Sequence, residues 1–152
     1  MERVHHAASL RPVRTRDTLL TYLGKILVFA AVYFLAAQIG FLAPFDGELS
    51  TLIWPASALS LTTLLIFGWK LWPGITIGAV LVALANQHSP PLTATIAITH
   101  TMEPLVGALI LANRPRFHRS LESLPDVFWF LIVAALISPL TGAILGVASF
   151  TI

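Results

Sequence analysis

A tryptophan-proline pair occurs twice in the chain, and a single apolar run separates the two copies. Proline is tolerated in the first helical turn, where its missing N–H has no partner to lose, so Pro55 and Pro73 each predict the start of a helix. The 18 positions from Trp54 to Trp72 cover about 27 Å at about 1.5 Å per residue, close to the roughly 30 Å hydrocarbon core of a bilayer. Indole rings favour the headgroup level, so the two tryptophans are predicted at opposite interfaces. This stretch therefore predicts a helical hairpin in a membrane.

The composition excludes a water-soluble core. Apolar residues make up 57% of the 152 positions and charged residues only 11%, whereas a soluble domain has about 25% charged residues. The chain has no cysteine, which excludes disulfides, thiolate nucleophiles and cysteine-ligated metals. Five of the nine Lys and Arg residues lie in the first 25 positions, beside an apolar run. We interpret them as charges that set membrane orientation rather than as a nucleic-acid site.

The apolar pattern predicts an all-α polytopic bundle with about five spans. Residues 1–17 are predicted to form a basic cytoplasmic tail, and residues 18–152 the membrane domain. The predicted spans cover residues 18–43, 52–69, 73–86, 92–113 and 127–150. Alternating the loops across the membrane puts Ile152 on the outer side, directly after an apolar helix. We therefore expect the sequence to be incomplete at its carboxyl end, or to be a truncated gene product.

Several residues are assigned structural roles by the pattern. Gly74 and Gly78 lie four positions apart, which predicts a face that presses on another helix. Asn86 begins an outer turn, and Asp126 is positioned to cap the last span. Phe117, Leu121 and Leu124 fall at helical spacing, so residues 114–126 predict a short amphipathic turn on the inner leaflet.

The fourth predicted span contains His100 and Glu103, three residues apart and so on the same helical face. An ionisable residue at bilayer depth costs about 2.5–3.5 kcal/mol on insertion scales and normally faces the bundle interior with a partner. Pro104 follows directly and is expected to kink the helix. The pair is open to two main interpretations: a structural tie between helices, or a centre that senses protons or a ligand.

Catalytic and cofactor sites find no support in the sequence. One histidine and one carboxylate leave a metal shell unfilled, so neither a metal nor another cofactor is expected. There is no nucleophile elbow and no glycine-rich phosphate loop. We therefore predict that the chain is not an enzyme.

The motifs occur in a characteristic order along the chain. They comprise YFLAAQIGFL (33–42), IWPASALSLTTLLIFGWKLWPGITIGA (53–79), Asn86, THTMEPLVGALIL (99–111), FHRSLESLPDVFWFL (117–131) and TGAILGVASF (141–150). This series resembles the MASE1 domain, a bacterial integral-membrane sensory domain, from about Gly24 to the end. Residues on the family pattern are Trp54, Pro55, Gly68, Trp72, Pro73, Gly78, Asn86, Glu103 and Asp126. Ala58 departs from it, because the family usually has glycine there, and the helix contact at this point is expected to be looser.

The resemblance implies an amino-terminal input module of roughly eight helices in the bacterial inner membrane. Such a module precedes a cytoplasmic histidine kinase or a cyclic-di-GMP enzyme, so an output domain that follows covalently is an expected partner, beside the lipid bilayer and a second copy of the chain in a homodimer. We predict a sensor that transmits by helix rearrangement, with Glu103 and His100 at its responsive centre. The alternatives are a fragment of a transporter or channel with a polar pathway on span four, and a small membrane protein that regulates a full receptor.

Overall fold

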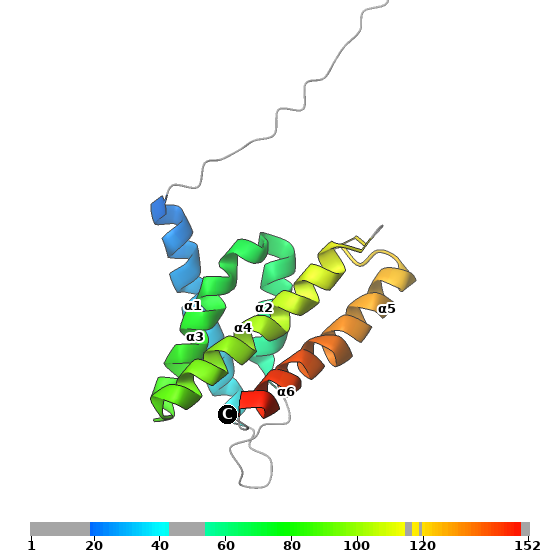
Figure 1. Cartoon of the computed structure of the whole chain (residues 1–152). Coiled ribbons are helices and arrows are strands. Elements are labelled where there is room, and N and C mark those ends of the chain that lie inside the picture. Colours follow the sequence, from blue (N-terminus) through cyan, green and yellow to red (C-terminus); the bar gives the residue numbers. More distant parts are fainter. Residues whose placement is uncertain (1–18, 43–53, 115–116, 119, 150–152) are drawn as a thin grey trace, which may run out of the picture.

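The computed structural model of the chain describes residues 19–42, 54–114, 117–118 and 120–149. Every regular element in these ranges is helical, which confirms the all-α prediction for the described part of the chain (Figure 1). The elements are α1 (Leu19–Phe41), α2 (Pro55–Phe67), the 3₁₀ turn η1 (Trp69–Leu71), α3 (Trp72–Ala85), α4 (Pro90–Ala112), α5 (Leu124–Ile132), the π-helical turn η2 (Val133–Ile137) and α6 (Ser138–Ser149). The predicted tail at 1–17, the outer turn at 44–50 and Ile152 lie outside the described residues.

Proline marks the beginning of four helices. Pro55 is the first residue of α2 and Pro73 the second residue of α3, as predicted. Prolines occupy the same first-turn positions in α4 and α5. The first turn has no intrahelical acceptor for its N–H groups, so proline fixes the helical φ there at no cost in hydrogen bonds.

The chain turns back between α2 and α3 as predicted, although these two helices have almost no contact with each other. It reverses at Gly68, whose φ of 95° belongs to a backbone region that side chains with a Cβ rarely adopt. The Gly68 N–H still donates to the Leu64 carbonyl at 3.1 Å and ends α2. The Tyr22 hydroxyl of α1 donates to the Lys70 carbonyl at 2.8 Å. This bond ties the turn to the beginning of α1.

Three of the helical segments are long and apolar enough to cross a membrane: Leu19–Phe41, Pro90–Ala112 and Leu124–Ala148. The hairpin helices are shorter, with 13 residues in α2 and 14 in α3. Each therefore covers only about 20 Å at about 1.5 Å per residue. The five predicted segments are present and alternate in direction (Figure 1), but only three reach spanning length by themselves.

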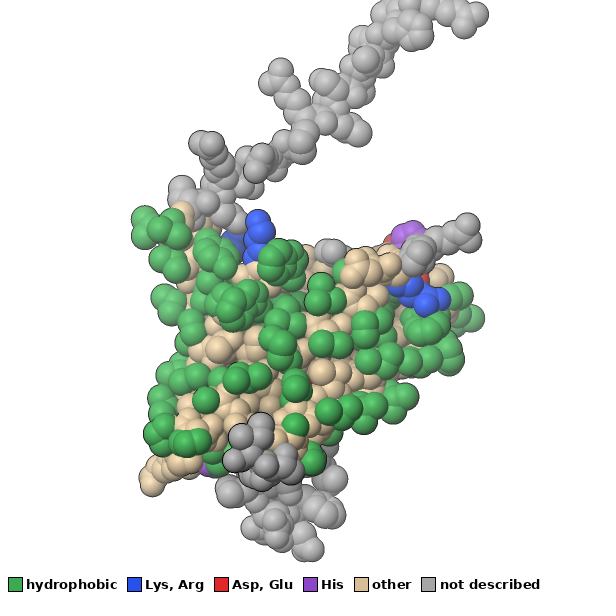
Figure 2. All heavy atoms as spheres, viewed as in Figure 1, with side chains coloured by type: hydrophobic (Ala, Val, Ile, Leu, Met, Phe, Trp, Pro, Cys, Tyr) green, Lys and Arg blue, Asp and Glu red, His purple; other side chains and the backbone are tan. Residues whose placement is uncertain are grey.

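The outer surface of the bundle is apolar. Large side chains of α1 such as Leu27 and Ile39 are about 60% exposed, at 62% and 61%. Hydrophobic side chains cover the visible middle of the molecule, while Lys and Arg gather at the end where α1 begins (Figure 2). Such a band suits contact with lipid tails, and the cations suit a headgroup region.

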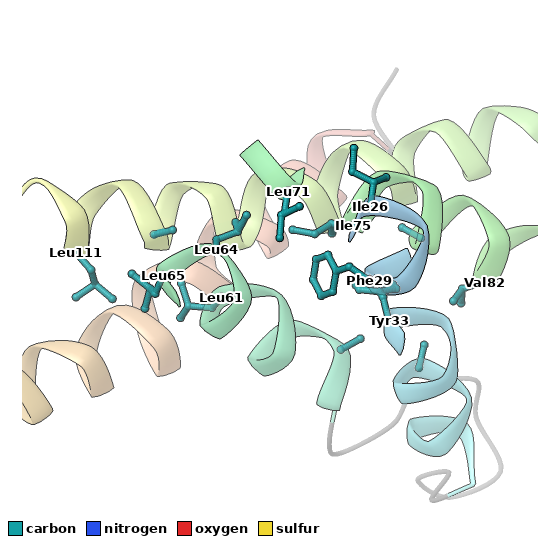
Figure 3. Packing of buried hydrophobic residues seen from close by; sticks show 14 of the residues in the cluster. Ile26, Phe29, Tyr33, Leu61, Leu64, Leu65, Leu71, Ile75, Val82 and Leu111 are labelled. Atoms are coloured by element: carbon teal, nitrogen blue, oxygen red, sulfur yellow. The ribbon is translucent and has the colours of Figure 1, made fainter. Parts of the chain in front are cut away.

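The glycines of α3 form the seam against α1. A Cβ on Gly74 would lie 2.9 Å from Phe29 Cδ1, and a Cβ on Gly78 would lie 2.7 Å from Tyr33 Cδ1. Both aromatic side chains are buried and point toward α3, near Ile75 (Figure 3). The predicted pressing face is thus confirmed, since only glycine lets the two backbones approach this closely.

The predicted amphipathic turn before α5 is wrong for its described residues. Residues 117–118 and 120–123 contain no helix, and Leu121 has a φ of 54°. A positive φ at a residue with a Cβ breaks the helical path, so the i, i+4, i+7 spacing does not place its members on one helical face. The helix begins only at Leu124.

Asp126 is not the cap of this helix. Ser123 is the N-cap residue, and its side-chain oxygen accepts from the Asp126 N–H. Asp126 lies in the first turn, and its carboxylate accepts from the Ser123 hydroxyl at 2.7 Å. The Ser123 hydroxyl thus accepts from the Asp126 N–H and donates to the Asp126 carboxylate. His118 Nδ1 lies 3.4 Å from the same carboxylate, which ties the preceding loop to the helix.

The last long segment is irregular in the turn before Pro139. The Ser138 N–H donates to the Val133 carbonyl, five residues back, so residues Val133–Ile137 form a π turn between α5 and α6. Pro139 directly follows Ser138 and lacks an N–H of its own. In α4, by contrast, the helix continues through Pro104 from Pro90 to Ala112.

Candidate functional site

Helix α4 carries the candidate site because it packs against α2, α3 and α6. Glu103 lies on its buried side and is 8% exposed. The Ser57 hydroxyl of α2 lies within hydrogen-bonding reach of its carboxyl group. On the other side, a Cβ added to Gly142 of α6 would lie 2.9 Å from Glu103 Oε2. The carboxyl group is therefore held between α2 and α6.

His100 lies beside Glu103 without a direct hydrogen bond. Its Nδ1 is 4.0 Å from Glu103 Oε2, which is longer than a hydrogen bond between these atoms. The ring instead stacks on Trp54, with ring centroids 5.6 Å apart and an interplanar angle of 24°. Trp54 in turn meets Phe41 edge to face at 5.2 Å. An aromatic row from α1 through Trp54 to α4 thus flanks the carboxyl group.

Two cavities adjoin this aromatic row. One, of about 650 Å³, lies between α2, α4 and the α5–α6 segment and is lined by Glu103, Ser57 and Thr99 among others. The second, of about 370 Å³, is lined by Tyr33, Asn86 and other residues of α1, α3 and α4. Trp54 and His100 line both cavities. The stacked rings are therefore the wall that the two cavities share.

Three buried polar atoms around the centre have no hydrogen-bond partner: Trp54 Nε1, Thr99 Oγ1 and His100 Nδ1. No other buried side-chain polar atom in the described ranges is left unsatisfied. All three belong to residues that line the larger cavity. Leaving a buried donor or acceptor unpaired costs about 1–3 kcal/mol each. The unsatisfied groups thus belong to residues that line the same cavity as Glu103.

The contact between α4 and α6 is polar and close. The Ser138 hydroxyl donates to the backbone carbonyl of Glu103 at 2.7 Å. A Cβ on Gly107 would lie 3.1 Å from Ser138 Oγ and from Leu61 Cδ1. Glu103 therefore touches α6 through its side chain, against Gly142, and through its backbone, against Ser138.

The other predicted residues lie away from Glu103. Asn86 caps α3, with its side-chain Nδ2 donating to the Val82 carbonyl at 2.8 Å. Trp72 is 40% exposed at the hairpin turn. Asp126 lies in the first turn of α5. Of the predicted structural residues, only Trp54 lies with His100 and Glu103. Trp54 was predicted at the membrane interface, but its ring instead stacks on His100.

Sequence reasoning missed four residues of the centre: Ser57, Thr99, Ser138 and Gly142. Ser57 and Gly142 gave a signal, as small residues at helix contacts, but nothing in the pattern tied them to Glu103. Within the described ranges no group of three His, Cys, Asp or Glu residues is close enough to hold a metal ion.

Comparison with protein families gives one match. The model of the MASE1 family matches residues 26–152. The chain belongs to the MASE1 family. MASE1 domains are membrane-associated sensory domains, so this chain is a membrane-associated sensory domain of a family that is not catalytic. The match begins within two residues of the predicted limit at Gly24 and confirms the resemblance. Neither the curated proteins nor the solved structures contain a significant match to the chain.

Proposed function

We propose that this MASE1 domain is the signal-sensing input domain of a bacterial receptor in the inner membrane, with a histidine kinase or a cyclic-di-GMP enzyme as its covalently attached output. Membership of a family of membrane-associated sensory domains supports this proposal. The signal acts in or near the bilayer, and the response is a rearrangement of helices. No enzymatic step belongs to the domain itself.

One observation carries the proposal: a carboxyl group and three buried polar atoms without a hydrogen-bond partner belong to residues that line one cavity inside an apolar bundle. A purely structural tie would pair its polar groups with each other. Here Glu103 and His100 are 4.0 Å apart, and the His100 nitrogen that faces the carboxyl has no hydrogen-bond partner. The His100 nitrogen therefore retains the capacity to bind a proton beside the carboxyl group.

Coupling follows from the contacts of Glu103 with α6. Its carboxyl group lies against Gly142, and its carbonyl accepts from Ser138. A signal that changes the hydrogen bonds of the carboxyl group therefore changes how α6 packs on α4. A signal shifts the population of two packings only by its difference in affinity for them. The contacts of Glu103 with Gly142 and Ser138 give the signal such a difference in affinity, because they change when α6 packs differently on α4.

The proposed orientation has a cytoplasmic amino terminus and five crossings, which puts residue 152 outside. Three basic residues support this orientation, because successive helices alternate in direction and bring all three to the same end of the bundle. They are Lys25, Lys70 and Arg114. Cytoplasmic ends of membrane helices carry an excess of Lys and Arg. Within this orientation Asn86 and His88 face the outer side.

The test is the substitution Glu103→Gln in a full-length receptor that carries this domain. It retains the shape of the side chain but removes its capacity for negative charge. Hydrogen bonds to charged groups contribute about 1.5–3 kcal/mol, so we expect the output, measured as kinase or cyclase activity in membranes, to change by about tenfold or more. Glu122→Gln, at an exposed loop position, is the matched control. Normal insertion with an unchanged response would refute the proposal.

A transporter or channel is the second candidate. The two cavities that share the Trp54–His100 wall favour it, since opening that wall would join them into one longer passage. The experiment is ion flux in vesicles containing the purified chain. Flux above that of empty vesicles would favour this candidate over the sensor.

A further inference from the structure

The buried residues of the last long segment do not keep one helical spacing. In α5 and the turn after it, Asp126 and Val133 are buried and lie seven positions apart, about two helical turns. In α6, Ser138 and Gly142 are buried and lie four positions apart. The interval between the two sets, from Val133 to Ser138, is five. Five positions of a regular α-helix correspond to about 140° around the axis, so the two sets could not face the same side without an extra residue.

The π turn supplies that residue. The Ser138 N–H donates to the carbonyl of Val133, the fifth residue back, where an α-helix uses the fourth. One extra residue turns everything that follows by about 100° compared with an uninterrupted helix. Without the π turn, Ile137 would therefore take the place of Ser138, and Thr141 the place of Gly142.

This register is the one that fits α4, which lies alongside α6 (Figure 1). Glu103 lies over a glycine of α6, since a Cβ on Gly142 would be 2.9 Å from its Oε2. Ser138 lies over a glycine of α4, since a Cβ on Gly107 would be 3.1 Å from its Oγ. Each larger side chain thus meets a glycine of the other helix. π turns are rare inside α-helices, so we attribute this one to the contacts that it allows.

α6 is held less firmly than α5. Phe130 and Val133 belong to the main hydrophobic cluster, whereas no residue of α6 does. The guanidinium group of Arg114 lies 3.7 Å from the ring centroid of Trp129 and ties α5 to the end of α4. Turning α5 would break these contacts. Turning α6 would change only those at Ser138 and Gly142 among the contacts described above.

Thr141 would give a second register its own hydrogen bond. Its hydroxyl now donates to the Ile137 carbonyl at 2.9 Å. In the place of Gly142 it would lie beside the Glu103 carboxylate, a charged acceptor that forms stronger hydrogen bonds than a neutral carbonyl. The carboxyl group would have to shift to admit the Thr141 Cβ, and the cavity of about 650 Å³ that Glu103 lines gives it room. Glu103 thus has a different neighbour in each register, a glycine or a hydroxyl.

We propose that the π turn at Val133–Ile137 is a register switch for α6. While the turn is π-helical, Gly142 lies on Glu103, as in the structure. When the turn becomes α-helical, α6 rotates by about 100° and brings Thr141 to Glu103. The switch stands on the helix geometry alone. That its two registers are the two packings between which a signal selects rests on the proposed function.

The first experiment removes the extra residue. Ala135 is an exposed residue of the π turn, and its deletion would leave a continuous α-helix that retains Ser138 and Gly142 on α4. We expect the dodecyl sulfate concentration that unfolds the purified domain from mixed micelles to be unchanged or higher. Deletion of Ala31, an exposed alanine in the regular helix α1, is the matched control. It would turn one half of α1 by about 100° against α3 and should lower the midpoint clearly.

The second experiment observes the rotation. The chain has no cysteine, so spin labels can be attached to introduced cysteines and their separations measured by pulsed electron paramagnetic resonance in lipid nanodiscs. Val147 of α6 is paired with Ile39 of α1 and, separately, with Ile98 of α4, all three of them exposed. A helix with its side chains is about 10–12 Å wide, so a turn of about 100° moves a label on α6 by about 8 Å. Two reference positions detect a movement that leaves one of the separations unchanged.

Gly142→Ala should drive the switch, because its Cβ is excluded from the observed register. We expect a separation several ångströms away from that of the unmodified chain in at least one label pair. Gly146→Ala, one turn later on α6 and with nothing within 4 Å of its Cβ, is the matched control and should leave both separations unchanged. Gly142→Ala in the chain without Ala135 should also leave them unchanged, since no π turn remains to convert.

Two results would overturn the inference: deletion of Ala135 that lowers the midpoint as much as deletion of Ala31, or separations in Gly142→Ala equal to those of the unmodified chain. Both are separable from failure of the proposed function. If the labels do not move while Glu103→Gln still alters receptor output, the switch is refuted and the sensing role stands. If the labels move while Glu103→Gln and Gly142→Ala leave the output unchanged, the switch stands and the sensing role fails.

Discussion

Among the glycines that the structure describes, Gly78 has the tightest surroundings and gives the sharpest stability prediction. Adding a single methyl group at Gly78 would put its carbon 2.7 Å from Tyr33 Cδ1, and 2.9 Å from both Cβ and Cγ of the same residue. Real Cβ atoms essentially never approach other heavy atoms this closely. The Tyr33 ring cannot swing away freely, since it is only 1% exposed. Gly78→Ala should therefore force α1 and α3 apart.

The magnitude follows from two opposing terms. Overpacking a well-packed contact costs about 1–3 kcal/mol. Alanine is a better helix former than glycine by about 0.5–1 kcal/mol, which offsets part of that cost. Gly24→Ala in α1 isolates the second term, because nothing lies within 4 Å of a Cβ there. The free energies of unfolding of the two variants should therefore differ by about 1–3 kcal/mol, with Gly78→Ala the less stable.

The assay is unfolding of the purified domain from mixed micelles by added dodecyl sulfate, followed by tryptophan fluorescence and far-ultraviolet circular dichroism. A second measurement combines Gly78→Ala with Tyr33→Ala, which removes two of the three closest atoms. The cost of the alanine at position 78 should then fall, giving a non-zero coupling energy. Equal stability of Gly78→Ala and Gly24→Ala would show that the two helices adjust without strain and would refute the close-contact argument.

Two further predictions concern the turns. Gly68→Ala should lower the free energy of unfolding by about 1–3 kcal/mol, because alanine is strained at the φ of 95°. An unchanged free energy of unfolding in the same assay would show that the turn adopts another conformation. Ser123→Ala removes the N-cap of α5 and should cost about 1 kcal/mol, whereas Ser123→Thr, which retains the hydroxyl that donates to Asp126, should restore most of it; equal stability of Ser123→Ala and Ser123→Thr would argue against the cap.

The fold was largely predictable because the membrane restricts the choices. A chain with so few charges can satisfy its backbone in lipid only as helices, and the prolines at 55 and 73 fix where two of them begin. Loops are less constrained. Helical spacing in the segment before α5 was misleading, because Leu121 adopts a positive φ that local periodicity does not reveal.

The candidate centre was predictable only in part. Glu103 and His100 are conspicuous, since ionisable residues are expensive at bilayer depth. Their partners come from other helices. The stack of Trp54 on His100 joins residues 46 positions apart, and Gly142 approaches Glu103 from a helix that begins 35 positions after it. Such contacts depend on which helices pack together, and spacing along one helix carries no information about that.

The two sides of the bundle differ in what they can do. On one side, α1 and α3 meet at a seam of glycine against aromatic rings, where any relative movement would meet hard steric contact. On the other side, α6 meets α4 at Ser138 and Gly142, and the space beside it is a cavity. We therefore expect α1, α3 and the turn between α2 and α3 to act as the fixed frame, with α6 as the element that shifts when the centre at Glu103 changes its partners.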